Sequence, residues 1–470
     1  MNTKVIAIAV IAVLLVGGVV GVVLYMNGNN GPGAGDRVGE ELSKSDYPNS
    51  ASRLWVYGNA NEDDKIDAND VTALEKMVKG DLDKTQLADT NVDGKVDSKD
   101  VDYLKDIINA DKDTKIKVYY VDNYFKIAKV SWPVKTIGTT YCSGLYTAET
   151  TGLTTKISLI DDTIKKYWAK LNSHLADAIS MSDTDNPNYE KIIESEVSVY
   201  VPGWCNADVD PVLREKLEPA GIDVMFMNTC DNSGVDMTNE YIDRSIIMFG
   251  YLLQGDLEKT YAYLDWHDDI MNKIKTAASA IPDNAKKALI MARNSPKYVE
   301  NDKYSLTGVG NTNMIHAAWA GCYVVADHYK TDLPKNYNTL GAEGIATLLH
   351  KLKTNEIDKV YWMYNDHDGL RQQKDKLLSD GTHAWYEQHS AIVEAIPAMD
   401  YLGMAREAGN SPLYIVEMAF YYNALYGALD GVDFTNLFNY WIDHFTTEKE
   451  KYAASGVDIN HFFKDFGPTP

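Results

Sequence analysis

The sequence predicts an α/β fold in two halves, preceded by a small helical module and an apolar N-terminal segment. From residue 115 onward, short β-rich runs alternate with longer amphipathic stretches, a pattern typical of α/β architecture. A stretch at 256–280 repeats apolar residues at close to the helical period, so we expect one long helix there, dividing the α/β region. An acidic loop occurs twice between residues 54 and 110, ahead of that region.

Composition restricts the classes of function. A chain of 470 residues with 45% apolar and 24% charged residues can form a full core in two or three domains. The net charge of −23 excludes a uniformly basic surface, so we expect no nucleic-acid partner. The four cysteines form no CxxC pair, and whether Cys205 and Cys230 bond to each other stays open.

The N-terminal segment determines the expected compartment. Residues 5–25 are uncharged and number 21, enough to span the hydrocarbon of a membrane. Lys4 precedes them and acidic residues follow, which favours an inside N-terminus. We therefore predict a transmembrane anchor within 1–26, a flexible Gly- and Asn-rich linker at 27–53, and the rest of the chain on the extracellular face. A cleaved signal peptide, giving a secreted protein, is the alternative.

The α/β region is predicted to comprise a first lobe at 115–255, a bridging helix at 256–281 and a second lobe at 282–470. The expected strands lie at 115–121, 129–132, 196–201, 222–227, 287–293 and 358–363. The expected helices, besides the bridging one, lie at 157–175, 212–217, 413–428 and 434–445.

The two acidic loops align at a spacing of thirty residues, NANEDDKIDAND at 59–70 and DTNVDGKVDSKD at 89–100. Both place oxygen-bearing side chains at loop positions 1, 3, 5, 9 and 12, and position 7 would offer a main-chain carbonyl. Calcium takes six to eight oxygen ligands, so we expect two calcium ions as cofactors. The predicted ligands are Asn59, Asn61, Asp63, Lys65, Asp67 and Asp70 in loop 1, and Asp89, Asn91, Asp93, Lys95, Asp97 and Asp100 in loop 2.

Each loop leads into an amphipathic helix, and position 12 is Asp where an EF-hand has Glu. In these respects residues 54–110 resemble a dockerin module, a small all-α tandem calcium-loop domain. The resemblance implies a cohesin-type partner, with recognition residues at loop positions 10 and 11, here Ala68, Asn69, Ser98 and Lys99. Loop 1 departs from the pattern with Asp64 at position 6, where glycine is preferred. A structural calcium module without a cohesin partner remains the alternative.

Two α/β halves joined by one long helix outside a membrane resemble the substrate-binding proteins of metal-chelate ABC importers. The similar segments are VSWPVKTIGTTYCSGLYTAETTGL at 130–153, VYVPGW at 199–204, DPVLREKLEPAGIDVMFMNTC at 210–230, IIMFGYLLQGDLEKTYAYLDWHDDI at 246–270 and SPLYIVEMAFYYNALY at 411–426. The resemblance implies a two-lobed fold that binds an iron–siderophore, haem or cobalamin chelate between the lobes and docks on an ABC permease.

Candidate ligand residues follow from that geometry, because ligands of open α/β sheets bind at loops after strand ends. Aromatic side chains suit flat macrocycles and catecholates. The predicted ligand-binding residues are Tyr141, Cys142, Tyr146, Trp204, Asn228, Trp319, Tyr364 and His367. His316 is a further candidate metal ligand.

An enzymatic function is the rival hypothesis, because dockerins usually accompany carbohydrate-active enzymes. Glycoside hydrolysis needs two facing carboxylates, and no local motif singles out such a pair. The sequence contains no G-x-S-x-G or HExxH motif. We therefore expect no catalysis, and keep a dockerin-bearing carbohydrate-active enzyme or carbohydrate-binding surface protein as the alternative.

Overall fold

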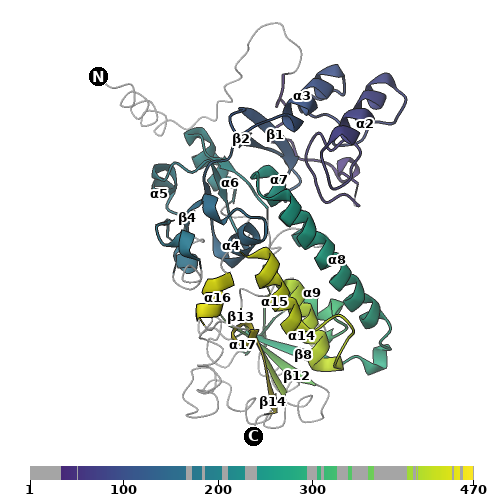
Figure 1. Cartoon of the computed structure of the whole chain (residues 1–470), viewed down its shortest axis with the longest axis vertical. Coiled ribbons are helices and arrows are strands. Elements are labelled where there is room, and N and C mark those ends of the chain that lie inside the picture. The colour runs from purple at the N-terminus through teal and green to yellow at the C-terminus, as the bar shows by residue number, and fades with distance from the viewer. Residues whose placement is uncertain are drawn as a thin grey trace.

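The computed structural model describes residues 33–49, 51–165, 172–182, 186–203, 210–227, 241–293, 304–307, 312–324, 337–340, 358–364, 400–405, 409, 411–446, 449–455 and 459–468. From the N-terminus these residues form a helical module, a first α/β lobe, one long helix and a second α/β lobe (Figure 1). The predicted membrane anchor at 5–25 lies outside the described residues. Among the described residues, no helix has both the length and the apolar character needed to cross a membrane.

Residues 33–49, which we call the N-terminal strap, pack against the module and the first lobe. Gly35 N donates to Asn91 O at 2.8 Å, and Leu42 N donates to Phe125 O at 2.9 Å. Leu42 is buried, and the Tyr47 ring stacks on Phe125 with centroids 4.2 Å apart. The prediction of a flexible linker over 27–53 is therefore wrong for its described part, because burial of these apolar side chains offsets the entropy lost on ordering.

The two helices expected after the acidic loops are present. Each loop runs into a helix, α2 (Ala68–Lys79) after loop 1 and α3 (Ser98–Ile108) after loop 2. Both helices begin with a capping box in which the position-9 and position-12 aspartates satisfy main-chain N–H groups at the helix start. Leu74, Met77 and Leu104 are almost fully buried between the two helices.

The module continues into the first lobe without an intervening linker. The hairpin of β1 (Ile116–Val121) and β2 (Ile127–Trp132) follows α3, and residues 55–57 pair with β1. Tyr57 N donates to Tyr119 O and Val121 N to Trp55 O, both at 2.9 Å. These side chains belong to the same core cluster as the first lobe, so the boundary at 110–115 separates segments of one packed body.

The first lobe is a parallel sheet in the order β5-β4-β3-β6-β7. Its strands are β3 (Ile137–Thr139), β4 (Ile157–Ile160), β5 (Ile179–Ser180), β6 (Val199–Val201) and β7 (Asp223–Val224). Its helices are α4 (Tyr141–Thr150), α5 (Tyr189–Glu194), α6 (Asp210–Leu217) and α7 (Tyr241–Leu252). Single 3-10 turns occur at Lys44–Asp46, Thr154–Lys156, Ser173–Leu175 and Glu218–Ala220.

The predicted helix at 157–175 is wrong at its start, which forms strand β4. Ile157, Leu159 and Ile160 are buried, inside a parallel sheet whose two faces are covered. The sequence predicts one face of a helix here, because a short apolar run is compatible with both the helical period and the strand period.

The bridging helix is confirmed as α8 (Leu257–Ser279), with Asp256 as its N-cap, accepting from Lys259 N at 3.0 Å. It is the long helix between the lobes in Figure 1. It packs against α7 of the first lobe and α14 (Tyr414–Tyr426) of the second.

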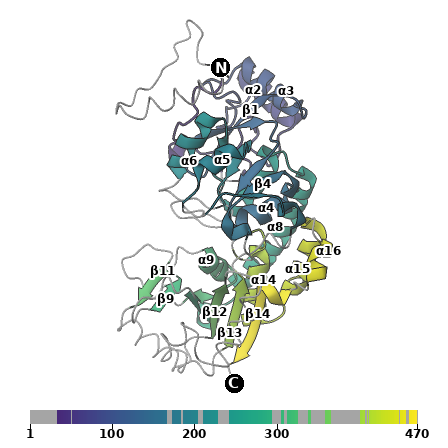
Figure 2. The same ribbon diagram turned by 90° about the vertical axis from the view of Figure 1, so that its left-hand side faces the viewer.

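The second lobe contains a mixed sheet in the order β11-β9-β8-β12-β13-β14, with β10 also paired to β8. Its strands are β8 (Ala288–Arg293), β9 (Tyr304–Thr307), β10 (Tyr323–Val324), β11 (Tyr337–Leu340), β12 (Lys359–Tyr364), β13 (Asp400–Ala405) and β14 (Phe463–Pro468). Its other helices are α9 (Thr312–Trp319), α15 (Phe434–Phe445), α16 (Lys449–Ser455) and α17 (Ile459–Phe462), and a 3-10 turn lies at Asp283–Ala285. Figure 2 shows this sheet below the first lobe, with α14 and α15 beside it.

The lobes also touch away from the bridging helix. Trp441 on α15 donates from Nε1 to Thr150 Oγ1 on α4 at 3.3 Å, and its ring packs against Tyr146 with centroids 5.8 Å apart. On the bridging helix itself, Tyr263 donates to Pro412 O at 2.6 Å. One continuous apolar core therefore runs from the strap to the second lobe.

Candidate functional site

The first-lobe sheet has a topological switch point at β3. The chain leaves β3 for β4 on one side, and β6 pairs with β3 on the other, so the loops at the carboxyl ends of β3 and β6 meet. Gly203 N donates to Thr140 Oγ1 at 2.8 Å there. A Cβ on Gly203 would lie 1.9 Å from Thr140 O, so only glycine permits this approach. Ligands of open α/β sheets bind at such an edge.

Three of the predicted ligand residues follow β3, in a segment expected to be a loop. The structure places Tyr141, Cys142 and Tyr146 on α4 instead. Cys142 and Tyr146 are buried, with Tyr146 against Trp441. Tyr141 is 9% exposed and lies at the strand end, where its N–H donates to Asp161 Oδ2 at 2.8 Å. Of the three, Tyr141 is therefore the residue nearest to the switch-point edge, and the other two contribute to the core.

The remaining predicted ligand residues are spread more widely. Trp204, Asn228 and His367 lie outside the described residues, as do Cys205 and Cys230. Tyr364 ends β12, inside the second-lobe sheet. Trp319 ends α9 and is half-buried, with the Lys275 ammonium 4.5 Å from its ring centroid. The structure therefore brings Trp319 against α8.

His316, the further candidate metal ligand, is buried between α9 and α14. Its Nδ1 lies 2.7 Å from Glu417 Oε2, and its ring stacks on Tyr414 with centroids 4.6 Å apart. Glu417 is also fully buried, and it accepts from Asn313 Nδ2 at 2.8 Å. His316 Nε2 is buried without a hydrogen-bond partner among the described residues.

A groove of about 630 Å³ lies where the end of α3, the β1–β2 hairpin and the first-lobe sheet meet. Four lysines line it, Lys112, Lys115, Lys117 and Lys135, together with Asp113, Glu196 and Asp223. The described residues predicted to bind ligand lie elsewhere, so this groove does not correspond to the predicted site.

Loop 2 has the hydrogen-bond pattern of a closed oxygen-lined loop. Asp89 Oδ1 accepts from Asp93 N at 3.0 Å, and its Oδ2 accepts from Gly94 N at 2.9 Å. Asp100 closes the loop by accepting from Asn91 N at 3.1 Å and from Asp97 N at 2.8 Å. Gly94 at position 6 has φ +85°, which favours glycine.

Loop 1 repeats the closure but differs at positions 1 and 6. Asp70 accepts from Asn61 N at 3.1 Å and from Asp67 N at 2.8 Å. Asn59 is fully buried and donates from Nδ2 to Leu54 O at 2.7 Å. Its Oδ1 has no hydrogen-bond partner among the described residues. Asp64, which stands where loop 2 has glycine, is not among the residues with positive φ.

These residues fit calcium. The predicted side-chain ligands are all oxygen donors, which is the set a hard cation takes, and the orphaned buried Oδ1 of Asn59 would gain a partner. Burial raises the pKa of Asp70 and of Asp100 to about 6, against main-chain N–H donors that lower it. A bound cation would supply the positive charge that these buried carboxylates lack. Four of the predicted ligands in loop 2 are carboxylates, against three in loop 1, so loop 2 is expected to bind calcium more tightly.

The four predicted partner-binding residues are all exposed. Ala68 and Asn69 begin α2, and Ser98 and Lys99 begin α3. They are therefore available to a partner protein in this structure.

Solved structures resemble the chain over most of its length. A TroA-like periplasmic binding protein, FepB from Veillonella parvula, matches with a TM-score of 0.52 and 13% identity, over 70% of this chain and 96% of that one. The molybdate periplasmic binding protein MolA of Haemophilus influenzae, bound to molybdate, matches with a TM-score of 0.51 and 12% identity, over 70% and 97%.

The chain has the fold of a periplasmic solute-binding protein. This agrees with the two-lobed architecture predicted from the sequence. No family model and no curated protein matches the chain, and the neighbours provide no support for the dockerin resemblance of 54–110.

Proposed function

We propose that this protein is an extracellular solute receptor for an ABC importer, that it binds a metal chelate of the iron–siderophore, haem or cobalamin class, and that it does not catalyse a reaction. The observation that carries the proposal is the pair of α/β lobes joined by α8, with a switch point at β3. The neighbours FepB and MolA are binding proteins by name, and MolA holds a metal oxyanion. The permease would recognise the loaded receptor, which an anchor at 1–26 would hold at the membrane.

Tryptophan fluorescence of the full chain, with calcium present, tests the ligand class. We expect saturable quenching by one member of a panel of ferric siderophores, haem, cobalamin and molybdate. Tyr141→Ala should weaken that response, because Tyr141 lies at the switch-point edge, whereas Tyr440→Ala, at an exposed position of α15, should not. A response to an oligosaccharide alone would favour the carbohydrate-binding or carbohydrate-cleaving alternative.

We also propose that loops 1 and 2 each hold one calcium ion, through the twelve predicted ligands. The support is the closed hydrogen-bond pattern of both loops and the orphaned Asn59 Oδ1. Calorimetry on chelator-treated full chain should find two sites. Asp70→Ala and Asp100→Ala should each leave one site, because position 12 closes its own loop. A full chain without measurable calcium binding would refute the assignment.

Calcium-dependent binding of a cohesin-type partner is the proposed role of the exposed residues that begin α2 and α3. Purified cohesin domains from the same cell provide the test. Asn69→Asp together with Lys99→Asp should weaken binding, with Thr72→Ser on exposed α2 surface as the control. If no cohesin binds in calcium, the module has a structural role within this protein.

A further inference from the structure

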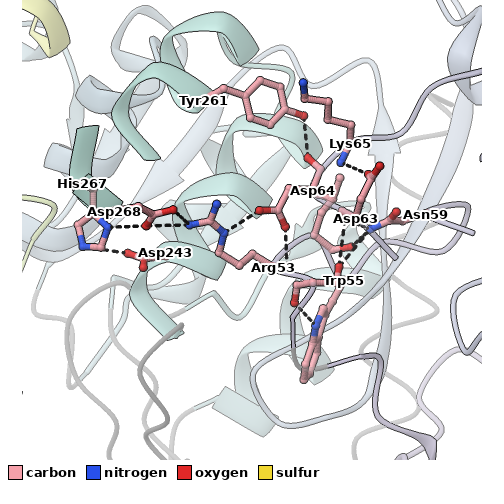
Figure 3. Close-up of polar contacts among 12 residues, drawn as sticks. Arg53, Trp55, Asn59, Asp63, Asp64, Lys65, Asp243, Tyr261, His267 and Asp268 are labelled. Carbon is pink, nitrogen blue, oxygen red and sulfur yellow. Dashed lines mark hydrogen bonds and ion pairs between the residues drawn. The ribbon is translucent and has the colours of Figure 1, made fainter. Parts of the chain in front are cut away.

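Loop 1 is docked directly on the bridging helix. Tyr261 of α8 donates to the carbonyl oxygen of Asp64 at 2.9 Å, and burial raises the Tyr261 pKa to about 12, so the hydroxyl stays a donor. Arg53 donates from N and Nε to the two Asp64 carboxylate oxygens at 2.8 and 2.7 Å. The same arginine donates from Nη1 to both oxygens of Asp268 on α8, at 3.1 and 2.9 Å (Figure 3).

The contact continues from α8 into both lobes. His267 Nδ1 lies 3.1 Å from Asp268 Oδ1, and His267 Nε2 lies 3.5 Å from Asp243 Oδ1 on α7. Tyr414, the first residue of α14 in the second lobe, donates to the same Asp243 oxygen at 2.9 Å. His267 and Tyr414 are almost fully buried. A chain of polar contacts therefore joins loop 1 to helices of both lobes, and Figure 3 shows its path from Asp64 to Asp243.

The charges of these residues stabilise the chain of polar contacts between loop 1 and α8. Asp64 and Asp268 flank the single guanidinium of Arg53, whose side chain is 17% exposed. Burial acts to raise the pKa of Asp268, but the hydrogen bond from His267 and the charge of Arg53 hold it below its usual value. The ionised carboxylate is therefore the favoured form, and the arginine remains paired on both sides.

This docking explains the residue that departs from the calcium-loop pattern. Position 6 of loop 2 is Gly94, near the strap, and Arg37 of the strap donates to Asp89 Oδ2 at 3.0 Å. Position 6 of loop 1 is Asp64, and both its carboxylate and its carbonyl are used to hold Arg53 and Tyr261. The unusual aspartate is thus the attachment point of loop 1 to α8.

We propose that calcium in loop 1 fixes the bridging helix, so that occupancy of loop 1 and the relative position of the two lobes are thermodynamically linked. The inference rests on the proposed calcium binding. The predicted ligands Asp63 and Lys65 stand on either side of Asp64, so an ion that holds them also fixes the attachment point between them. Without the ion, repulsion among the loop carboxylates loosens the same segment. By reciprocity, a ligand that moves the lobes changes the calcium affinity of loop 1 by the same factor by which calcium changes the affinity for that ligand.

Amide hydrogen exchange of the full chain, with calcium and with chelator, tests the link. We expect calcium to slow exchange in residues 257–268 of α8 by tenfold or more in the native chain. Asp100→Ala, which removes the loop 2 ion, should keep this protection. Asp70→Ala, which removes the loop 1 ion, should reduce it to less than twofold. Equal protection in both variants would overturn the proposal.

A milder pair of variants keeps the test valid if Asp70→Ala does not fold. Tyr261→Phe removes one attachment of loop 1 to α8 and leaves all calcium ligands in place, and Tyr103→Phe, at the hydroxyl that donates to Lys117 O on β1 at 2.9 Å, is the control. We expect both to bind two ions by calorimetry, and only Tyr261→Phe to lose calcium protection in α8, by threefold or more. If the native chain binds no calcium, the calcium assignment is refuted. If it binds two ions without any change in amide exchange in α8, only the link is refuted.

Discussion

Asparagine at position 1 of loop 1 is required by the fold, which leads to a sharp prediction for Asn59→Asp. The Asn59 amide nitrogen donates to Leu54 O at 2.7 Å, to Asp63 O at 2.5 Å and to Ser52 Oγ at 3.3 Å. A carboxylate would set an acceptor against two carbonyl oxygens in a fully buried position. Two lost hydrogen bonds at about 1 kcal/mol each, plus about 1–3 kcal/mol for unsatisfied buried acceptors, give a loss of roughly 3–5 kcal/mol without calcium.

The matched control is Asn61→Asp, which adds the same charge at position 3 of the same loop. Asn61 is exposed, and its amide nitrogen donates to Asp63 Oδ2 at 2.9 Å, so we expect a loss below about 1 kcal/mol. Urea denaturation of the full chain in chelator, followed by fluorescence, measures the free energy of unfolding of both variants. In calcium, Asn59→Asp should recover part of its loss because the carboxylate can ligate the ion. Equal losses in chelator for the two variants would refute the reasoning.

Three further predictions concern the core, the lobe interface and pH. Leu104→Ala should lower the free energy of unfolding by about 2–5 kcal/mol in urea denaturation, because Leu104 is fully buried in the module core. Trp441→Phe removes the hydrogen bond to Thr150 and should cost about 1 kcal/mol in the same assay, with faster amide exchange in α4. Calcium affinity should fall about tenfold per loop between pH 7 and pH 5 by calorimetry, because Asp70 and Asp100, with pKa values of about 6, take up protons that compete with the ion. Without calcium, the folding stability of the module should instead rise as the pH falls. Because folding raises the pKa values of Asp70 and Asp100, the module should be more stable at pH 5 than at pH 7, which urea denaturation in chelator can check.

The two acidic loops and their exit helices could be located from the sequence because their signal is local. Position 12 lies eleven residues after position 1, so its carboxylate can close the loop on nearby main-chain N–H groups, and both exit helices begin at position 10. The bridging helix was predictable for a similar reason, since its apolar spacing persists from Leu257 to Ile274.

The wrong predictions concern segments whose structure depends on contacts with residues far away in the sequence. Residues 141–150 contain Thr, Ser, Gly and Tyr, which are weak helix formers, yet burial of the whole segment makes it helix α4. The Gly-rich start of residues 27–53 indicated a tether, although Leu42 and Tyr47 anchor the strap. The bond between Arg53 and Asp268 spans 215 residues, and no spacing rule connects two such positions.

The contact between Trp441 and Thr150 also governs when the protein can finish folding. These residues are 291 positions apart, and at ordinary synthesis rates of about 5–20 residues per second the later one follows the earlier by roughly 15–60 s. During that interval the face of α4 that receives Trp441 has no cover, and strand β13 lacks its partner β14 until residues 463–468 have been made. Long-range closure of this kind is slow and exposes apolar surface. A holding chaperone, or export of the chain in an extended form, would keep this apolar surface covered until the distant partner segments emerge.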